Sequence, residues 1–136
     1  MNMKSSRPCM HCEAGHMRLD TRDVTVSLGD LSKVVKDVHG WFCDQCDEIE
    51  FADAASAERY AAVSDALLTE KKVRQSAEIR RIRKKLRLTQ QEAADIFGGG
   101  VNAFSRYELG KVEPPRSVVK LLEVLGRHPD LLDEVR

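Results

Sequence analysis

Three consecutive glycines, Gly98 to Gly100, restrict the fold of this chain most strongly, because they interrupt a segment that otherwise favours helix. Before them, Thr89 is followed three residues later by Glu92, a capping-box pattern in which the hydroxyl and the carboxylate satisfy backbone amides of a first helical turn. A helix should therefore begin at Gln90. Glycine has little helical preference and tolerates positive φ angles, so this helix should end at the glycines in a tight turn.

A second short helix is predicted after the glycines, from about Val101 to Leu109. At about 100° per residue, its side chains separate into an apolar face and a polar face. The apolar face, which would pack inward, contains Ala103, Phe104 and Tyr107. The polar face contains Asn102, Ser105 and Arg106.

The polar face carries the chemistry needed to read DNA bases. An asparagine amide matches the major-groove edge of adenine, and an arginine guanidinium matches that of guanine. Asn102 and Arg106 lie four residues apart, so both could reach neighbouring base pairs from one recognition helix. Ser105 on the same face and Gln90 at the start of the preceding helix complete the candidate DNA contacts. Taken alone, an exposed Asn and Arg are more often an ordinary solvated surface.

The formal net charge of the 136 residues is zero, but the charge is divided unevenly along the chain. Residues 1–70 carry 7 basic and 13 acidic side chains, a net charge of −6, whereas residues 71–136 carry 15 basic and 9 acidic ones, a net charge of +6. The second part should therefore prefer a polyanion such as DNA. A run of basic residues that leads into the two short helices could contact phosphates from its outer side. That side carries Arg80, Lys84 and Arg87.

The four cysteines form two CxxC pairs, Cys9 with Cys12 and Cys43 with Cys46. Each pair can fold as a turn that directs two sulfurs at one point, and four thiolates complete a tetrahedral shell around Zn²⁺. Such a closed shell has no open position for water, which indicates one structural Zn²⁺ per chain. Disulfide pairing is the alternative. His11 and His16, which lie near the first pair, could also replace a cysteine as ligand.

Several functional classes find no support in the sequence. No apolar run approaches the roughly 20 residues of a membrane span, and the N-terminus lacks the apolar core of a signal peptide. We therefore expect a cytoplasmic protein without membrane contact, in a reducing compartment that favours metal binding over disulfides. No catalytic arrangement of residues stands out, so enzyme activity is not expected. Iron held by four thiolates for electron transfer is a further alternative.

The predicted fold class is an α+β module followed by an all-α domain. Residues 1–72 should form the α+β zinc-binding module, with two or three antiparallel strands within 23–42 and then a helix capped by Asp53. The face of this helix that should pack on the sheet contains Ala57, Tyr60, Ala61, Ser64, Leu67 and Leu68. The apolar pattern fades near residues 69–78, where we expect a hinge or a frayed helix end.

Residues 73–136 should form an all-α, five-helix domain of the helix-turn-helix type. Pro114 and Pro115 end the recognition segment, and Ser117 is expected to cap a further helix. A short final helical turn is predicted near Leu131. Any leucines that the core does not use could form a twofold interface in a homodimer. The inward side chains of the capped helix should be Val118, Leu121, Leu122 and Leu125.

Two resemblances extend this interpretation. The segment around the glycines resembles the Cro/repressor type of helix-turn-helix, in which T-Q-x-E-x-A precedes a glycine turn and Y-E-x-G ends the next helix, as Thr89–Ala94 and Tyr107–Gly110 do here. Nearly the whole chain is similar to MqsA-type antitoxins. The residues that carry this similarity are the two CxxC pairs, His39-Gly40, the stretch from Phe97 to Glu108, Leu121-Leu122 and His128-Pro129.

The second resemblance implies a dimeric repressor of its own operon. Its zinc module would hold a ribonuclease toxin, and its C-terminal domain would form a homodimer on a palindromic operator in double-stranded DNA, read by Asn102 and Arg106. It also implies that Cys9, Cys12, Cys43 and Cys46 bind structural Zn²⁺. A stand-alone zinc-containing helix-turn-helix regulator, without a toxin partner, is the alternative interpretation.

Overall fold

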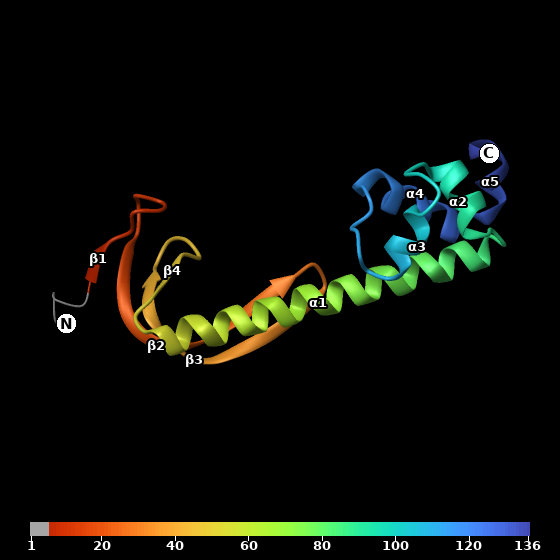
Figure 1. Ribbon diagram of the computed structural model, residues 1–136. Coiled ribbons are helices and arrows are strands. Elements are labelled where there is room, and N and C mark those ends of the chain that lie inside the picture. Colours follow the sequence, from red (N-terminus) through yellow and green to blue (C-terminus); the bar gives the residue numbers. More distant parts are fainter. Residues whose placement is uncertain (1–5) are drawn as a thin grey trace. The chain divides into compact units, whose positions relative to one another are not determined.

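The computed structural model describes residues 6–136. The chain consists of two compact units, Met1–Thr69 (unit 1) and Glu70–Arg136 (unit 2). Unit 1 contains the strands, and unit 2 contains the short helices (Figure 1). The long helix α1 (Ala54–Lys85) contributes its first part to unit 1 and its last part to unit 2. The predicted fold class is confirmed. No helix in the described part of the chain is long and apolar enough to cross a membrane.

The sheet of unit 1 is an antiparallel meander whose strands, within the described residues, lie side by side in sequence order. They are β1 (Ser6–Pro8), β2 (His16–Leu28), β3 (Leu31–Cys43) and β4 (Ile49–Phe51). β2 and β3 form a long hairpin that turns at Gly29, where the φ angle of 64° favours glycine. The sequence predicts two or three strands, because the outer strands are too short to show an alternating pattern.

The first part of α1 packs on the sheet. Leu67 is buried in the same cluster as the sheet side chains, and Tyr60 and Val63 pack against it. These spacings of three and four residues place the three side chains on one helical face. The predictions for Ala61 and Leu68 are wrong, since both are exposed. The buried sheet residues of the cluster are Val26, Leu31, Val35, Val38 and Phe42.

The start of α1 is capped as predicted, because Asp53 Oδ1 accepts a hydrogen bond from the Ser56 backbone N–H at 2.7 Å. The frayed helix end, one of two alternatives expected near residues 69–78, is wrong, since α1 is helical from Ala54 to Lys85. A hinge there stays a prediction. The apolar pattern fades there because most of these side chains are exposed. Local contacts support the helix instead, including an ion pair four residues apart between Glu70 and Arg74 at 3.1 Å.

In unit 2, α2 (Gln90–Phe97) begins with the predicted capping box. Thr89 Oγ1 accepts from the Glu92 N–H at 3.1 Å, and the Glu92 carboxylate accepts from the Thr89 N–H at 3.2 Å. These bonds lower the pKa of Glu92, with the backbone of Thr89 as the largest cause. The glycines that follow have φ angles of 86°, 98° and 91°. A Cβ at Gly99 would lie only 2.9 Å from the Cβ of Ala103, so the turn packs closely on the next helix.

That next helix, α3 (Ala103–Glu108), is shorter than predicted, and Asn102 flanks its N-terminus instead of lying within it. The chain turns away after this helix at Gly110, which has a φ angle of 73°. The Lys111 N–H bonds the Arg106 carbonyl at 2.9 Å, as in a Schellman termination. The side chains predicted to face inward are all buried, namely Ala103, Phe104 and Tyr107.

The remaining helices of unit 2 are α4 (Arg116–Arg127), the 3₁₀ turn η2 (Pro129–Leu131) and α5 (Leu132–Val135). The prediction that Ser117 caps α4 is wrong, because α4 begins two residues earlier, at Arg116 after Pro115, and no side chain caps it. The fixed φ of proline suits a helix start without a side-chain cap. The buried core of unit 2 includes Ile79, Ile82, Leu86, Leu88, Ala93, Phe104, Tyr107, Leu122, Leu125 and Leu132.

Candidate metal centre and nucleic-acid interface

The four cysteine sulfurs meet at one end of the sheet of unit 1. Their Sγ atoms all lie within 4.8 Å of one another, with Cys9 and Cys46 separated by 3.8 Å and Cys12 and Cys43 by 3.7 Å. A regular tetrahedron with Zn–S bonds of about 2.3 Å has edges of about 3.8 Å. The sulfurs therefore fit one tetrahedral ion, whereas a disulfide requires sulfurs about 2 Å apart. The four cysteines are therefore placed to bind one metal ion, as the sequence predicts.

The chain segments around the cysteines direct backbone N–H groups at the sulfurs. Gly15 N–H donates to Cys12 Sγ at 3.3 Å, and Gln45 and Cys46 N–H donate to Cys43 Sγ at 3.3 and 3.4 Å. The Cys9 N–H in turn bonds the Gly15 carbonyl at 2.9 Å, which closes the first turn. Such bonds orient the sulfurs and stabilise negative charge on them.

The thiols of this cluster do not share one acidity. Backbone hydrogen bonds from Ala14 and then Gly15 lower the pKa of Cys12 to about 6. The pKa of Cys46 changes in the opposite direction. A backbone hydrogen bond from Glu48 lowers it, but burial and the neighbouring thiols outweigh that bond and raise the pKa to about 12. Four thiols packed this closely cannot all ionise without a cation between them. The donor set is therefore that of a metal site.

Gly15 lies at the cluster in a position where any side chain would collide with the second cysteine turn. A Cβ built on Gly15 would lie 2.5 Å from Cys43 Sγ and 2.8 Å from the Cβ of Gln45. Both distances are shorter than real contacts, so the absence of a side chain allows the two cysteine turns to approach. On sequence grounds a glycine suits the turn after the first CxxC pair, but its close approach to Cys43 depends on the fold.

The histidines near the first pair do not belong to the cluster. Within the described residues, the metal-binding group at this end of the sheet consists of the cysteines alone. His11 is exposed, and its Nδ1 lies 3.8 Å from a carboxylate oxygen of Glu48. His16 is also exposed, and its backbone N–H donates to Asp44 Oδ1 at 2.8 Å. An all-sulfur ligand set is the simplest interpretation of this geometry.

The polar residues predicted to contact DNA gather around α3. Asn102 and Arg106 are exposed, and Ser105 is half-buried. Asn102 occupies the N-cap position of α3, yet its side chain makes no capping hydrogen bond. The side-chain oxygen of an N-cap asparagine usually accepts a hydrogen bond from a backbone N–H of the first turn. Here both the oxygen and the amino group of Asn102 are available to a ligand outside the chain.

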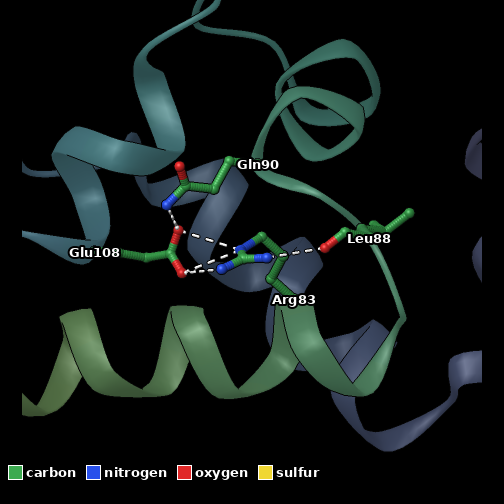
Figure 2. A network of polar contacts seen from close by, with 4 residues as sticks. All are labelled: Arg83, Leu88, Gln90 and Glu108. Atoms are coloured by element: carbon green, nitrogen blue, oxygen red, sulfur yellow. Dashed lines mark hydrogen bonds and ion pairs between the residues drawn. The ribbon is translucent and has the colours of Figure 1, made fainter.

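A buried ion pair fixes the other end of α3. Figure 2 shows Glu108, the last residue of α3, against Arg83 of α1. Arg83 Nε and Nη2 donate to Glu108 Oε1 at 3.0 and 2.8 Å, and the two side chains are only 12% and 5% exposed. Arg83 Nη1 also donates to the Leu88 carbonyl at 2.9 Å. The pair therefore ties α3 to α1 and to the connection before α2.

Gln90 belongs to the same network. Its Nε2 donates a hydrogen bond to Glu108 Oε2 at 2.8 Å (Figure 2). The side-chain amide of Gln90, a predicted DNA contact, therefore already has one partner within unit 2. A DNA contact from Gln90 stays a prediction. The pairing of Arg83 with Glu108 was not predicted, because an Arg within a basic run gives no sign that its charge is buried.

Known proteins resemble this chain over nearly its whole length. The family model described as the antitoxin component of a bacterial toxin–antitoxin system, MqsA, matches residues 7–136. Antitoxin MqsA of Escherichia coli strain K12 is 40% identical over 130 residues, which cover 94% of this chain and 98% of that protein. A solved structure of the N-terminal domain of the E. coli protein MqsA aligns with 47% of this chain and 94% of its own, at 22% identity and a TM-score of 0.38.

Replacing Gly15 with Ala should weaken metal binding by about 10- to 100-fold, the usual effect of disturbing groups that support metal ligands. The added Cβ would displace Cys43 Sγ or the second cysteine turn. Competition against a chelator of known affinity measures the effect. Gly29→Ala is the control. Its added Cβ would meet nothing within 4 Å, although alanine would be strained at the positive φ angle of this position. Equal metal affinity in Gly15→Ala and the unaltered protein would show that the close approach is unimportant.

Replacing Glu108 with Gln should destabilise unit 2 by about 3–5 kcal/mol, because the Arg83 charge would stay buried without a counterion. Amide hydrogen exchange of α3 in the full chain measures this free energy. The matched control is Glu78→Gln, which breaks an exposed pair with Arg81 at 2.6 Å and should cost no more than about 1 kcal/mol. The ion pair would be unimportant for unit 2 if both variants exchanged alike.

Proposed function

Since the chain belongs to the MqsA family of antitoxin components of bacterial toxin–antitoxin systems, we propose that it neutralises a ribonuclease toxin and represses its own operon. The observation that carries this proposal is the extent of the family match, residues 7–136, which includes both the cysteine cluster and the helix-turn-helix. In the proposal, unit 1 binds the toxin and unit 2 binds DNA.

Unit 1 is suited to a basic protein partner. Residues 1–70 carry a net charge of −6, and a ribonuclease needs a basic surface to hold RNA phosphates. The ion in the proposal is Zn²⁺, which supplies folding free energy to a unit whose sheet and helix segment bury few side chains. Four sulfur ligands leave it no open position for a substrate, so we assign it a structural role and the chain no enzyme activity. A reducing cytoplasm would keep such thiolates available.

Unit 2 is suited to the major groove of double-stranded DNA. The free amide of Asn102 would accept and donate to adenine, and Arg106 would donate to guanine. Ser105 lies between them in the chain and is half-buried. A homodimer formed through unit 2 would present two copies of α3 to half-sites about 34 Å apart, which corresponds to a palindromic operator.

The antitoxin function is tested with the protein encoded by the adjacent gene. We expect this protein to co-elute with the full chain in size-exclusion chromatography and to lose its ribonuclease activity in the complex. Cys43→Ser should abolish co-elution, because it removes a metal ligand and unfolds unit 1, while DNA affinity is retained in unit 2. Failure of the two proteins to associate would contradict the proposed antitoxin function.

The repressor function is tested by binding to the DNA upstream of the gene. Asn102→Ala and Arg106→Ala should each weaken binding by about 1–3 kcal/mol and relax specificity at one base position. Their metal content should be unchanged, since both side chains are exposed in unit 2. Lys84→Ala is the comparison, because loss of a phosphate contact weakens binding to all sequences alike. Unaltered base preference in both α3 variants would rule out reading by this face.

A further inference from the structure

The connection between α2 and α3 presents almost no side chains to its surroundings. Its first residues are Gly98 to Gly100, and only Val101 and Asn102 then precede α3. A Cβ added at Gly98 or Gly100 would meet nothing within 4 Å, so the surface there is open. A ligand that approaches this connection therefore meets bare backbone and two side chains, one apolar and one polar.

Val101 is an apolar side chain that the fold leaves uncovered. It is 74% exposed, more than any other large apolar side chain in the described residues of unit 2. The next residues in the chain that enter the core are Ala103 and Phe104, both buried. Val101 is therefore not part of the core of unit 2. The stability of unit 2 therefore does not depend on the methyl groups of Val101.

The position of Val101 next to Asn102 limits what its methyl groups could contact. In a helix-turn-helix complex, residues at the N-terminal end of the recognition helix contact base edges in the major groove. Those edges present hydrogen-bond donors and acceptors, and their apolar group is the C5-methyl of thymine. A valine against any other base edge would desolvate polar atoms without giving them a partner. The thymine methyl is the group that the chemistry of Val101 fits.

We propose that Val101 determines specificity by contacting the 5-methyl group of a thymine in, or next to, the base pair that Asn102 reads. This inference rests on the proposed DNA-binding function and adds one position of base preference to it. Thymine is preferred over cytosine and over uracil at that position, in each half-site of the operator. The contact is apolar, so it depends on the methyl group alone and not on hydrogen bonding.

The probe is operator DNA in which deoxyuridine replaces thymine, a change that removes only the methyl group. Footprinting of the full chain on the DNA upstream of its gene first locates the operator. Each thymine of one half-site is then replaced in turn. We expect one replacement to weaken binding about fourfold, the effect of burying one methyl group.

The variant Val101→Ala should bind thymine and deoxyuridine equally at that position, with its melting temperature unchanged. The matched control is Val112→Ala, which removes the same methyl groups from another exposed valine of unit 2. This control should keep the fourfold difference.

Two results would overturn the inference and leave DNA binding intact. In the first, no thymine replacement weakens binding of the unaltered protein. In the second, Val101→Ala retains the full difference between thymine and deoxyuridine. Absence of any binding to the upstream DNA would be a separate result, because it would remove the proposed repressor function itself.

Discussion

The orientation of α3 depends on the buried carboxylate of Glu108. A carboxylate that loses water must find equivalent hydrogen bonds inside the protein, and this one takes them from Arg83 and Gln90. A helix of six residues is too short to be stable alone. Burial of Phe104 and Tyr107 holds α3 in unit 2, but apolar packing tolerates rotation and sliding more readily than a two-pronged ion pair does. The network therefore selects one orientation among those that the core allows.

Unit 1 depends on a different constraint, the convergence of four sulfurs from the two connections at one end of the sheet. Cys9 and Cys12 lie between β1 and β2, while Cys43 and Cys46 lie at the end of β3 and in the connection to β4. The outer strands have only three residues each, so few ladder hydrogen bonds hold them. An ion at the cluster would join the two connections directly and fix both outer strands to the central hairpin.

The sequence predicted the features whose cause is local. The capping box at Thr89 and the CxxC spacing are patterns within a few residues, and the structure confirms both. Predictions that required knowledge of tertiary neighbours were less successful. A frayed helix end near residues 69–78 was one inference from the missing apolar pattern, but α1 is helical through these residues because its backbone hydrogen bonds do not require that pattern. The pairing of Arg83 with Glu108, 25 residues away, could not be read from either residue alone.

The two ends of α3 differ in how many contacts their residues make within unit 2. At the C-terminal end, Glu108 is bonded to α1 and α2, and Gly110 closes the helix with backbone hydrogen bonds. At the N-terminal end, Asn102 could stabilise the helix by about 1 kcal/mol with a side-chain cap, but it makes no such bond. Val101 is likewise left out of the core. Since the C-terminal end is fastened internally, the N-terminal end can leave these groups free, and it is the end that a major groove would receive.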